Sequence, residues 1–426
     1  MRFVSGLIGF IRRYSVLFVL VSIFLIKTPP FYLFPPIKSS LLTTHTLSRL
    51  FILLAFAGIY WEEIREKAKP LGQNAKLLLW FFVVYLIFQS LSLVGASNVI
   101  GFLQRYKDVV FPGLLLFVVV ARRIKREKVV LIFLLAASVN FVYQMIMFFL
   151  PHIFRSWGNE LVYSGHLELV LINLERGRMF IETYDEIAIP FIFFLLAKHN
   201  GRWARIGLIA IFLMVALPSF LSNFRSRAGI LIIAFLASFL FLTGRKIKEK
   251  IVLVCLFLFL AMTAVIVSNT FFGFSVVDRF ALRDTREDVE TLLYRAENIG
   301  TSVDMGISQP LTGIGLGNYF DNLATSKKMS KSLFNWVQRE AEIASTNPHD
   351  IFLQTLSETG VLSLIFVIML LGYFAYSDII ALKSKDYLTK ALIIAFWTLF
   401  SYSLFNPTTT LGYNSLFWLL RGLIIL

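Results

Sequence analysis

The segment DIFLQTLSETGVLSLIFVIMLLGYFAY, residues 350–376, decides how this chain folds. A helix of about 20 mostly apolar residues crosses the hydrocarbon core of a bilayer, and this segment is long and apolar enough to do so. The stretch before it, residues 269–348, is mostly polar. Together the two stretches predict a membrane-spanning helix that follows a large loop outside the membrane.

Apolar runs of similar length recur from one end of the chain to the other. Hydrophobic residues make up 57% of the 426 residues and charged residues only 16%, which is more apolar surface than one soluble core can hide. We therefore predict an all-α integral membrane protein, a single polytopic domain over residues 1–426 with about twelve transmembrane helices. The predicted spans are residues 14–26, 41–60, 77–96, 99–121, 129–150, 179–197, 203–221, 229–243, 251–268, 350–376, 387–404 and 411–426.

Basic residues are distributed unevenly among the predicted loops. Loops rich in Lys and Arg tend to stay in the cytoplasm. We therefore expect both termini in the cytoplasm and the 269–348 loop outside, and we attribute the net charge of +15 to membrane topology rather than to nucleic-acid binding. The loops that hold 22 of the 41 Lys and Arg are residues 2–13, 65–76, 122–128, 198–205, 245–250 and 383–390.

Signals for cleavage, disulfides and metal binding are weak. The first span is expected to be retained, because Lys27-Thr28-Pro29-Pro30 follows it in place of a small-residue cleavage pattern. The single cysteine, Cys255, lies within an apolar span, which excludes disulfides and argues against a thiolate metal site. No His/Asp cluster with metal-ligand spacing is visible, so we expect neither a metal nor a cofactor.

The 269–348 loop has an organisation of its own. Residues 327–344 predict a short helix near the membrane surface, and residues 279–304 predict an amphipathic helix. Between them, the glycines of PLTGIGLGNYFDNL, residues 310–323, predict a close backbone turn. Their G-x-G-x-G spacing without a strand–turn–helix unit does not indicate nucleotide binding. The apolar side chains of the amphipathic helix are Val289, Leu292, Leu293 and Ala296.

Asn347, Pro348 and His349 stand immediately before the segment quoted above. We expect Asn347 as the N-cap, Pro348 at the first helical position and His349 in the first turn. The positive end of the helix dipole keeps such a ring neutral, so His349 is suited to take a proton from a hydroxyl group at the outer membrane face. From the local sequence, a structural role at the membrane interface remains the alternative.

Arg225 and Arg227 lie in a very short predicted external connection, where the charge distribution of membrane proteins predicts few cations. Two guanidinium groups at this depth are suited to bind the phosphate oxygens of a lipid-linked diphosphate. The alternative is that both side chains extend toward lipid headgroups.

Further cations occur in and before the predicted amphipathic helix. Acidic neighbours make a surface salt bridge the default role for Arg295. Together with Arg279, Arg283 and Arg286, it also makes the loop suited to cover a bound anion. The acidic neighbours are Asp288, Glu290 and Glu297.

Acidic residues open the sixth predicted span. Glu182, Asp185 and Glu186 have i, i+3 and i+4 spacing, which places them on one helical face near the outside. Because acids in a membrane helix rarely face lipid, we favour pairing with the arginines over hydrogen bonding to a sugar. For the same reason, His45 and Arg49 in the second span are expected to face the bundle interior.

These motifs together resemble the O-antigen ligase and polymerase superfamily, polytopic glycosyltransferases that use undecaprenyl-diphosphate-linked glycans. Residues 226–229, Ser-Arg-Ala-Gly, are similar to the S-R-small signature of the family at the outer start of a span. Arg295 and the sequence PLTGIG of residues 310–315 are similar to its Arg and P-L-x-G-x-G motif. Residues 349–360 are similar to H-N-x-x-L-x-x-x-x-E-x-G, with Asp350 in place of the usual Asn. An Asp at this position is able to pair with the His349 ring and raise its pKa.

The resemblance implies that Arg227 and Arg295 hold the diphosphate and that His349 activates the acceptor hydroxyl. It implies direct displacement at the anomeric carbon with inversion, on the outer face of the bacterial inner membrane, without a metal, cofactor or nucleotide sugar. The expected partners are the lipid-linked glycan donor, a glycan or lipid A-core acceptor and membrane lipids, with no nucleic acid. We expect additional contributions to the site from Arg225, Asp350, Glu358, Glu182 and Asp185.

The sequence leaves two alternatives open. Within the class, ligation of finished glycan to lipid A-core is slightly favoured over polymerisation of repeat units. A flippase or other transporter of lipid-linked sugar is the alternative of another class, since twelve spans and interior charges also suit that architecture. The large one-sided loop and the lack of evident matched halves argue against it.

Overall fold

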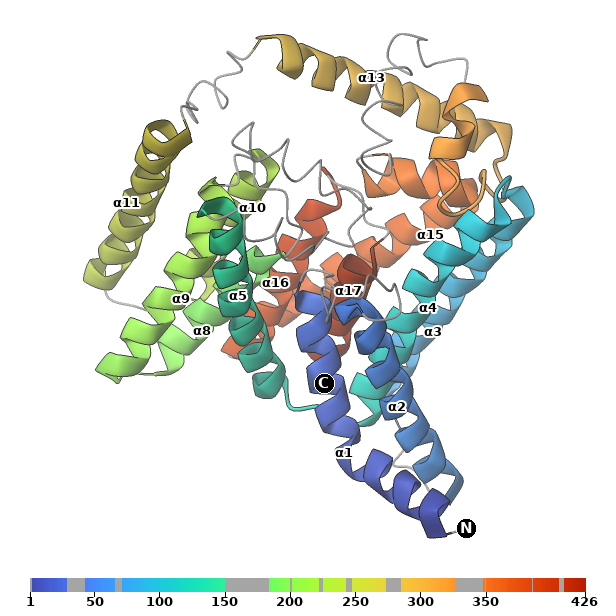
Figure 1. The fold of residues 1–426 in the computed structure, drawn as a ribbon, viewed down its shortest axis with the longest axis horizontal. Helices are drawn as coiled ribbons and strands as arrows, with labels where there is room; N and C mark the ends of the chain where they lie inside the picture. The colour runs from blue at the N-terminus through green and yellow to red at the C-terminus, as the bar shows by residue number, and fades with distance from the viewer. Residues whose placement is uncertain are drawn as a thin grey trace.

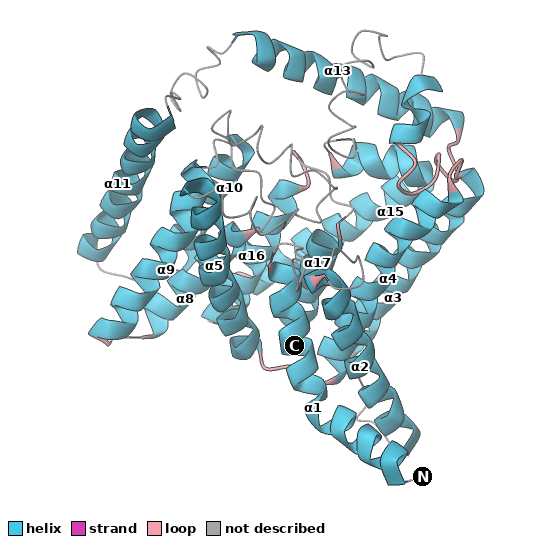
Figure 2. Ribbon diagram, viewed as in Figure 1, coloured by secondary structure: helices cyan, strands magenta, loops and turns pink. Residues whose placement is uncertain are grey.

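The computed structural model describes residues 2–28, 43–65, 71–149, 184–199, 201–221, 225–242, 247–272, 285–325, 348, 350–384, 386–405 and 410–426. Within these ranges the regular structure is entirely helical and contains no β-strand (Figure 2). The prediction of an all-α fold is therefore confirmed for the described residues.

Each of the twelve predicted apolar segments contains at least part of a described helix (Figure 1). The helices are α1 (Arg2–Lys27), α2 (Thr44–Arg65), α3 (Gln73–Leu91) with η1 (Ser92–Gly95), α4 (Val99–Ala121), α5 (Arg126–Phe149), η2 (Asp185–Ala188), α8 (Ile189–Lys198), α9 (Arg202–Leu221), α10 (Arg225–Leu242), α11 (Ile247–Phe272), α13 (Thr285–Ser308), η3 (Phe320–Thr325), α15 (Ile351–Ala381), α16 (Tyr387–Tyr402) and α17 (Leu411–Ile425).

Several of these helices have the length and composition of membrane spans. Within the described residues, four are long and apolar enough to cross a bilayer: Gln73–Gly95, Arg126–Ile146, Arg202–Leu221 and Ile351–Ala381. Five shorter helical stretches are also apolar: Thr44–Tyr60, Ser226–Leu242, Val254–Thr263, Tyr387–Tyr402 and Leu411–Ile425. The chain is a membrane protein that is helical throughout the regular structure of its described residues, while the count of twelve crossings and the side of the loop stay predictions.

The core of the bundle lies around α16 and α17. Every residue of α17 from Leu411 to Leu423 is buried, as is expected of a helix that is apolar on all sides. Helix α17 packs against α4 and α16, and α16 also packs against α8 and α10. In contrast, outer helices expose large apolar side chains, among them Trp80, Leu131 and Phe259, which suit contact with lipid.

One buried charge pair crosses this core. Arg421 of α17 donates from Nη1 to both carboxylate oxygens of Asp378 on α15, at 2.8 and 2.9 Å. Its guanidinium group also lies 3.8 Å from the ring centroid of Phe374 and 4.2 Å from that of Phe396. The charge is thus compensated by a carboxylate and by two aromatic faces.

The amphipathic helix predicted at residues 279–304 is present as α13, Thr285–Ser308. It lies across one end of the bundle, away from the N-terminus (Figure 1), and packs against α15. A Cβ on Gly306 of α13 would meet Leu356 of α15 at 2.6 Å, so the two helices approach closely at this glycine. The second short helix, predicted at residues 327–344, lies outside the described residues.

The sixth predicted span differs from the expectation. Residues 179–183 lie outside the described part, Tyr184 has left-handed dihedral angles (φ 51°, ψ 36°), and Asp185–Ala188 form a 3₁₀ turn. The α-helix α8 begins only at Ile189. Asp185 and Glu186 are therefore not on a continuous α-helix, because the left-handed Tyr184 interrupts the backbone before them.

Candidate functional site

A loop is inserted into the hydrogen bonding of helix α15. In a regular helix the N–H of Val361 would donate to the carbonyl of Ser357, four residues earlier. Instead it donates to the Pro310 carbonyl at 2.8 Å, and the Ser357 carbonyl accepts from the N–H of Ile314 at 2.9 Å. Residues 310–317, which we call the glycine loop, thus replace part of the hydrogen bonding of the helix.

Glycines allow this close approach. Gly360 breaks α15 with φ 86°, and Gly313 and Gly315 of the glycine loop have φ 63° and 96°. A Cβ on Gly313 would lie 2.4 Å from the carbonyl carbon of Glu358. The close turn predicted for these glycines is confirmed, and it fits the loop into the break of α15.

The two residues that directly follow the glycine loop form hydrogen bonds with two other elements. Asn318 accepts hydrogen bonds from the Asn98 backbone N–H at 2.6 Å and from the Ser97 hydroxyl at 3.2 Å, which ties it to the start of α4. Tyr319 donates its hydroxyl hydrogen to the side chain of Asn298 on α13. Burial raises the pKa of this Tyr319 hydroxyl. The loop, α13, α4 and α15 therefore form one packed unit.

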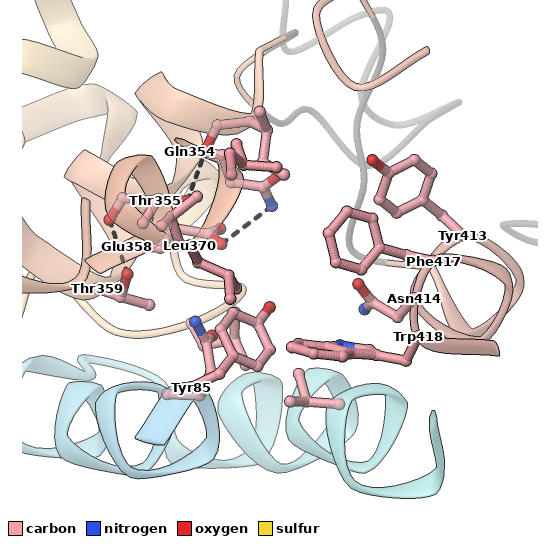
Figure 3. Close-up of a pocket in the computed structure, with 16 residues that line it drawn as sticks. Tyr85, Gln354, Thr355, Glu358, Thr359, Leu370, Tyr413, Asn414, Phe417 and Trp418 are labelled. Carbon is pink, nitrogen blue, oxygen red and sulfur yellow. Dashed lines mark hydrogen bonds between the residues drawn. The ribbon is translucent and has the colours of Figure 1, made fainter. Parts of the chain in front are cut away.

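Next to the glycine loop, whose Gly315 N–H donates to the Glu358 carbonyl, Glu358 faces a cavity between α15 and α17 (Figure 3). The Glu358 side chain is fully buried, and its Oε2 accepts a hydrogen bond from Gln354 Nε2 at 3.1 Å. Asn414, Phe417 and Trp418 form the opposite wall, and Tyr85 lies beside Trp418 (Figure 3). The cavity measures about 60 Å³, which is enough room for ordered water.

Arg227 lies in the first turn of α10 rather than in the predicted connection, because the helix already begins at Arg225. Its Nε donates to Oε1 of Glu186 at 3.0 Å, and the two side chains are 7% and 0% exposed. The same carboxylate accepts hydrogen bonds from the hydroxyls of Ser219 at 2.5 Å and of Tyr402. The predicted pairing of an acid of this segment with an arginine is therefore confirmed for Glu186.

Asp185, the neighbour of Glu186, has a different partner. Its Oδ1 accepts from Lys27 Nζ at 2.9 Å, and the Lys27 side chain at the end of α1 is fully buried. Asn140 and Gln144 of α5 donate side-chain hydrogen bonds to the same carboxylate at 2.9 and 3.2 Å. Four charged side chains thus form a buried cluster, which we call the charge cluster: Lys27, Asp185, Glu186 and Arg227.

The charge cluster is connected to the start of α15. Tyr402, which binds Glu186, is followed by Ser403, whose carbonyl accepts from the N–H of Ile351 at 2.8 Å. The ring of Tyr184 packs edge-on against that of Tyr402, with centroids 5.1 Å apart. The first residue of α15 and the pair of Arg227 with Glu186 are therefore joined through two consecutive residues of the chain.

The start of α15 differs from the prediction. Asp350 is the N-cap, and its Oδ1 accepts from the backbone N–H groups of Phe352 at 2.8 Å and Leu353 at 2.9 Å. The predicted N-cap Asn347 was therefore wrong, as was the first-turn position of His349, which precedes the cap. A carboxylate satisfies two helix-end N–H groups at once, which favours the start at Asp350. His349 and Asn347 themselves lie outside the described residues.

The remaining predicted site residues take other positions or lie outside the described part. Arg295 is exposed on α13, the helix that leads into the glycine loop. Arg49 binds Asp108 of α4 at 2.6 Å, which agrees with the predicted inward orientation. The side chains of Arg225, Glu182, Arg279, Arg283 and Arg286 lie outside the described part.

Two participants were missed from the sequence. Lys27 was interpreted only as the end of the first span, although a lysine directly after an apolar run is a candidate for an interior charge. Tyr402 has no local sequence signal, because a tyrosine in an apolar helix is ordinarily part of the core.

Comparison with protein families supports the resemblance. Residues 220–368 match the family model described as O-Antigen ligase. The matched segment contains Arg227, Arg295, the glycine loop and Glu358. The resemblance to the O-antigen ligase and polymerase superfamily is thereby confirmed for this segment. A comparison with curated proteins finds no match.

Proposed function

We propose that this protein is a glycosyltransferase of the O-antigen ligase type, which transfers a glycan from undecaprenyl diphosphate to an acceptor hydroxyl of lipid A-core. The match of residues 220–368 supports the ligase or polymerase type of function. The donor, the acceptor and the roles of individual residues are our proposal.

The observation that carries this proposal is the connection between two distant motifs. Arg227 binds Glu186, Glu186 binds Tyr402, and the next residue after Tyr402 binds Ile351, two residues after His349. These motifs are more than a hundred residues apart in sequence. Their connection supports a single site that contains an anion-binding arginine and a base.

In the proposed reaction, Arg227 and Arg295, assisted by Arg225, bind the diphosphate of the donor. The oxygen of the acceptor hydroxyl forms a bond to the anomeric carbon, and the bond from that carbon to the diphosphate oxygen breaks. The proton of the hydroxyl passes to His349 as general base. The negative charge that develops on the departing undecaprenyl diphosphate is stabilised by the guanidinium groups.

Supporting roles follow from the contacts described above. Asp350 caps α15 directly after His349, and Glu358 lies where the glycine loop enters α15. Asp185 and Glu186 compensate the cations of the charge cluster. We propose that these residues hold the reacting groups in position, with the site on the outer face of the bacterial inner membrane.

The test is reconstitution of the purified protein in liposomes with one undecaprenyl-diphosphate oligosaccharide and a choice of acceptors. We expect glycan on lipid A-core and release of undecaprenyl diphosphate, both reduced strongly in Arg227→Ala and Arg295→Ala. Lysine at either position should restore little of the transfer activity, because an ammonium group cannot bind a phosphate through two parallel N–H groups as a guanidinium group does.

Other outcomes of this experiment identify other functions. Longer glycan on the lipid carrier, with lipid A-core unmodified, would identify a polymerase with the same chemistry. Movement of the lipid-linked glycan across the bilayer without any new glycosidic bond would contradict the proposal and favour a transporter.

A further inference from the structure

We infer that Lys27 is a positioning residue for the donor diphosphate: its ammonium group neutralises Asp185 and thereby keeps the Arg227 guanidinium group from being drawn onto that carboxylate. This inference rests on the proposed function, because it assumes that Arg227 binds a diphosphate. It assigns a role to a residue of α1, far outside the matched segment 220–368.

Asp185 and Glu186 are consecutive residues of one 3₁₀ turn, so their carboxylates belong to one small rigid element. Lys27 binds the first at 2.9 Å and Arg227 binds the second at 3.0 Å. Two cations from distant helices, α1 and α10, are thus assigned one to each of two adjacent anions.

The four side chains of the charge cluster are almost completely buried, and their formal charges sum to zero. Arg227 interacts electrostatically with Asp185 as well as with Glu186, and Lys27 interacts with Glu186 as well as with Asp185. Each cation therefore has a second carboxylate within electrostatic reach, and the pairing depends on both cations being present.

Without the ammonium group of Lys27, Asp185 is buried and uncompensated, and Arg227 is the cation that remains to neutralise it. Two carboxylates then compete with a diphosphate for one guanidinium group. Without the carboxylate of Asp185, Lys27 is drawn toward Glu186, and the competition for Arg227 becomes weaker. The two changes should shift diphosphate affinity in opposite directions.

The experiment measures binding of undecaprenyl diphosphate itself to purified protein in nanodiscs, together with the donor KM and kcat. In Lys27→Met we expect the Kd and the KM to rise about tenfold, which is about 1.4 kcal/mol of lost binding free energy. In Asp185→Asn we expect the Kd to fall below the wild-type value, the direction opposite to that of Lys27→Met. The double variant Lys27→Met/Asp185→Asn, in which the cluster is again neutral, should bind within about twofold of wild type.

The other buried pair supplies a matched control. Arg421 and Asp378 also form an ion pair between a basic side chain and an aspartate, and their side chains are only 4% and 3% exposed. They lie on α17 and α15, outside the charge cluster. Asp378→Asn should lower the midpoint of thermal unfolding as Lys27→Met does. It should leave the Kd for undecaprenyl diphosphate unchanged, which separates positioning from loss of stability.

The inference is overturned if Lys27→Met and Asp185→Asn weaken binding equally, or if the double variant keeps the defect of Lys27→Met. If a single variant does not fold, Lys27→Arg and the neutral double variant decide instead, since both should fold and bind as wild type. If Arg227→Ala binds undecaprenyl diphosphate as well as wild type does, the proposed function of Arg227 fails. That result is distinct from failure of the inference about Lys27.

Discussion

Arg227 donates a hydrogen bond from Nε to Oε1 of Glu186 at 3.0 Å in the interior of the bundle. Both side chains are almost fully buried, and the hydroxyls of Ser219 and Tyr402 complete the shell of the carboxylate. A charge in this position is tolerated only with its partner, so the pair makes each residue dependent on the other.

The first prediction concerns Glu186→Gln. The substitution keeps the shape of the side chain and leaves the Arg227 charge buried without its carboxylate, which should reduce stability by about 3 to 5 kcal/mol. The midpoint of thermal unfolding in detergent measures the loss. Glu297→Gln on α13, at a half-exposed position, is the control and should change little. Equal shifts in the two variants would mean that the buried pair contributes no more than a surface charge.

The second prediction compares two glycines of α15. Gly360→Ala places a side chain at φ 86° and a Cβ 2.7 Å from the Pro310 carbonyl oxygen, so it should destabilise the protein by at least about 1 to 3 kcal/mol. Gly372→Ala meets no atom within 4 Å and should stabilise the helix by up to about 1 kcal/mol. Thermal unfolding of both variants tests this, and a tolerated Gly360→Ala would contradict the docking of the glycine loop.

The third prediction concerns His349→Gln. Glutamine keeps hydrogen-bonding capacity but cannot take up a proton near neutral pH, so glycan transfer should fall by about 10² to 10⁴. The amount of folded protein should stay near that of wild type. Rates measured from about pH 6 to 8 that match those of wild type would exclude proton abstraction as the role of His349.

The fourth prediction separates two roles of Asp350. As the N-cap of α15, Asp350→Ala should cost about 0.5 to 2 kcal/mol, whereas Asp350→Asn should cap nearly as well. Burial raises the pKa of the Asp350 carboxyl above its ordinary value, against the opposing effect of the Leu353 and Phe352 N–H groups. The folded protein therefore holds this proton to a higher pH than the unfolded chain does.

The sign of the pH dependence follows from that direction. The stabilising contribution of this proton is complete below the ordinary pKa of an aspartate and is lost as the pH rises through the raised pKa. The free energy of unfolding of wild type, relative to that of Asp350→Asn, should therefore decrease as the pH rises from the ordinary pKa of an aspartate through the raised pKa of Asp350. If the difference in stability between wild type and Asp350→Asn does not change with pH, the Asp350 carboxyl has the same proton affinity in the folded and unfolded states. Unchanged transfer activity in Asp350→Asn would argue that pairing with the His349 ring is not required.

The sequence predicted the helices well because each apolar run is long and is closed by charged or turn-forming residues. Hydrophobic length is a local property, so the start of α4 at Val99 and of α16 at Tyr387 agrees with the expectation. The sixth span was predicted poorly, because the left-handed backbone of Tyr184 leaves no mark in hydropathy.

Pairing was harder to predict than helices. The spacing of the acids and the unusual position of Arg227 suggested an interior ion pair, and Glu186 confirms it. The sequence could not show that Lys27 would be the partner of Asp185, since that contact spans 158 positions and depends on how α1 packs against α5. The N-cap was misjudged because Asn347 and Asp350 are both good caps, and only the three-dimensional path chooses between them.

The insertion of the glycine loop into α15 has a consequence for the order of assembly. The carbonyls of Ser357 and Glu358 accept hydrogen bonds from the N–H groups of Ile314 and Gly315 of the loop. Unsatisfied carbonyls are costly in a lipid environment, so the first turns of α15 reach their final state only when the loop has docked. Residues 310–315 are synthesised before α15. They therefore cannot form these hydrogen bonds until α15 has also been synthesised. Synthesis of α15, rather than of the loop, is therefore the step after which the loop is able to dock and complete the hydrogen bonding of α15.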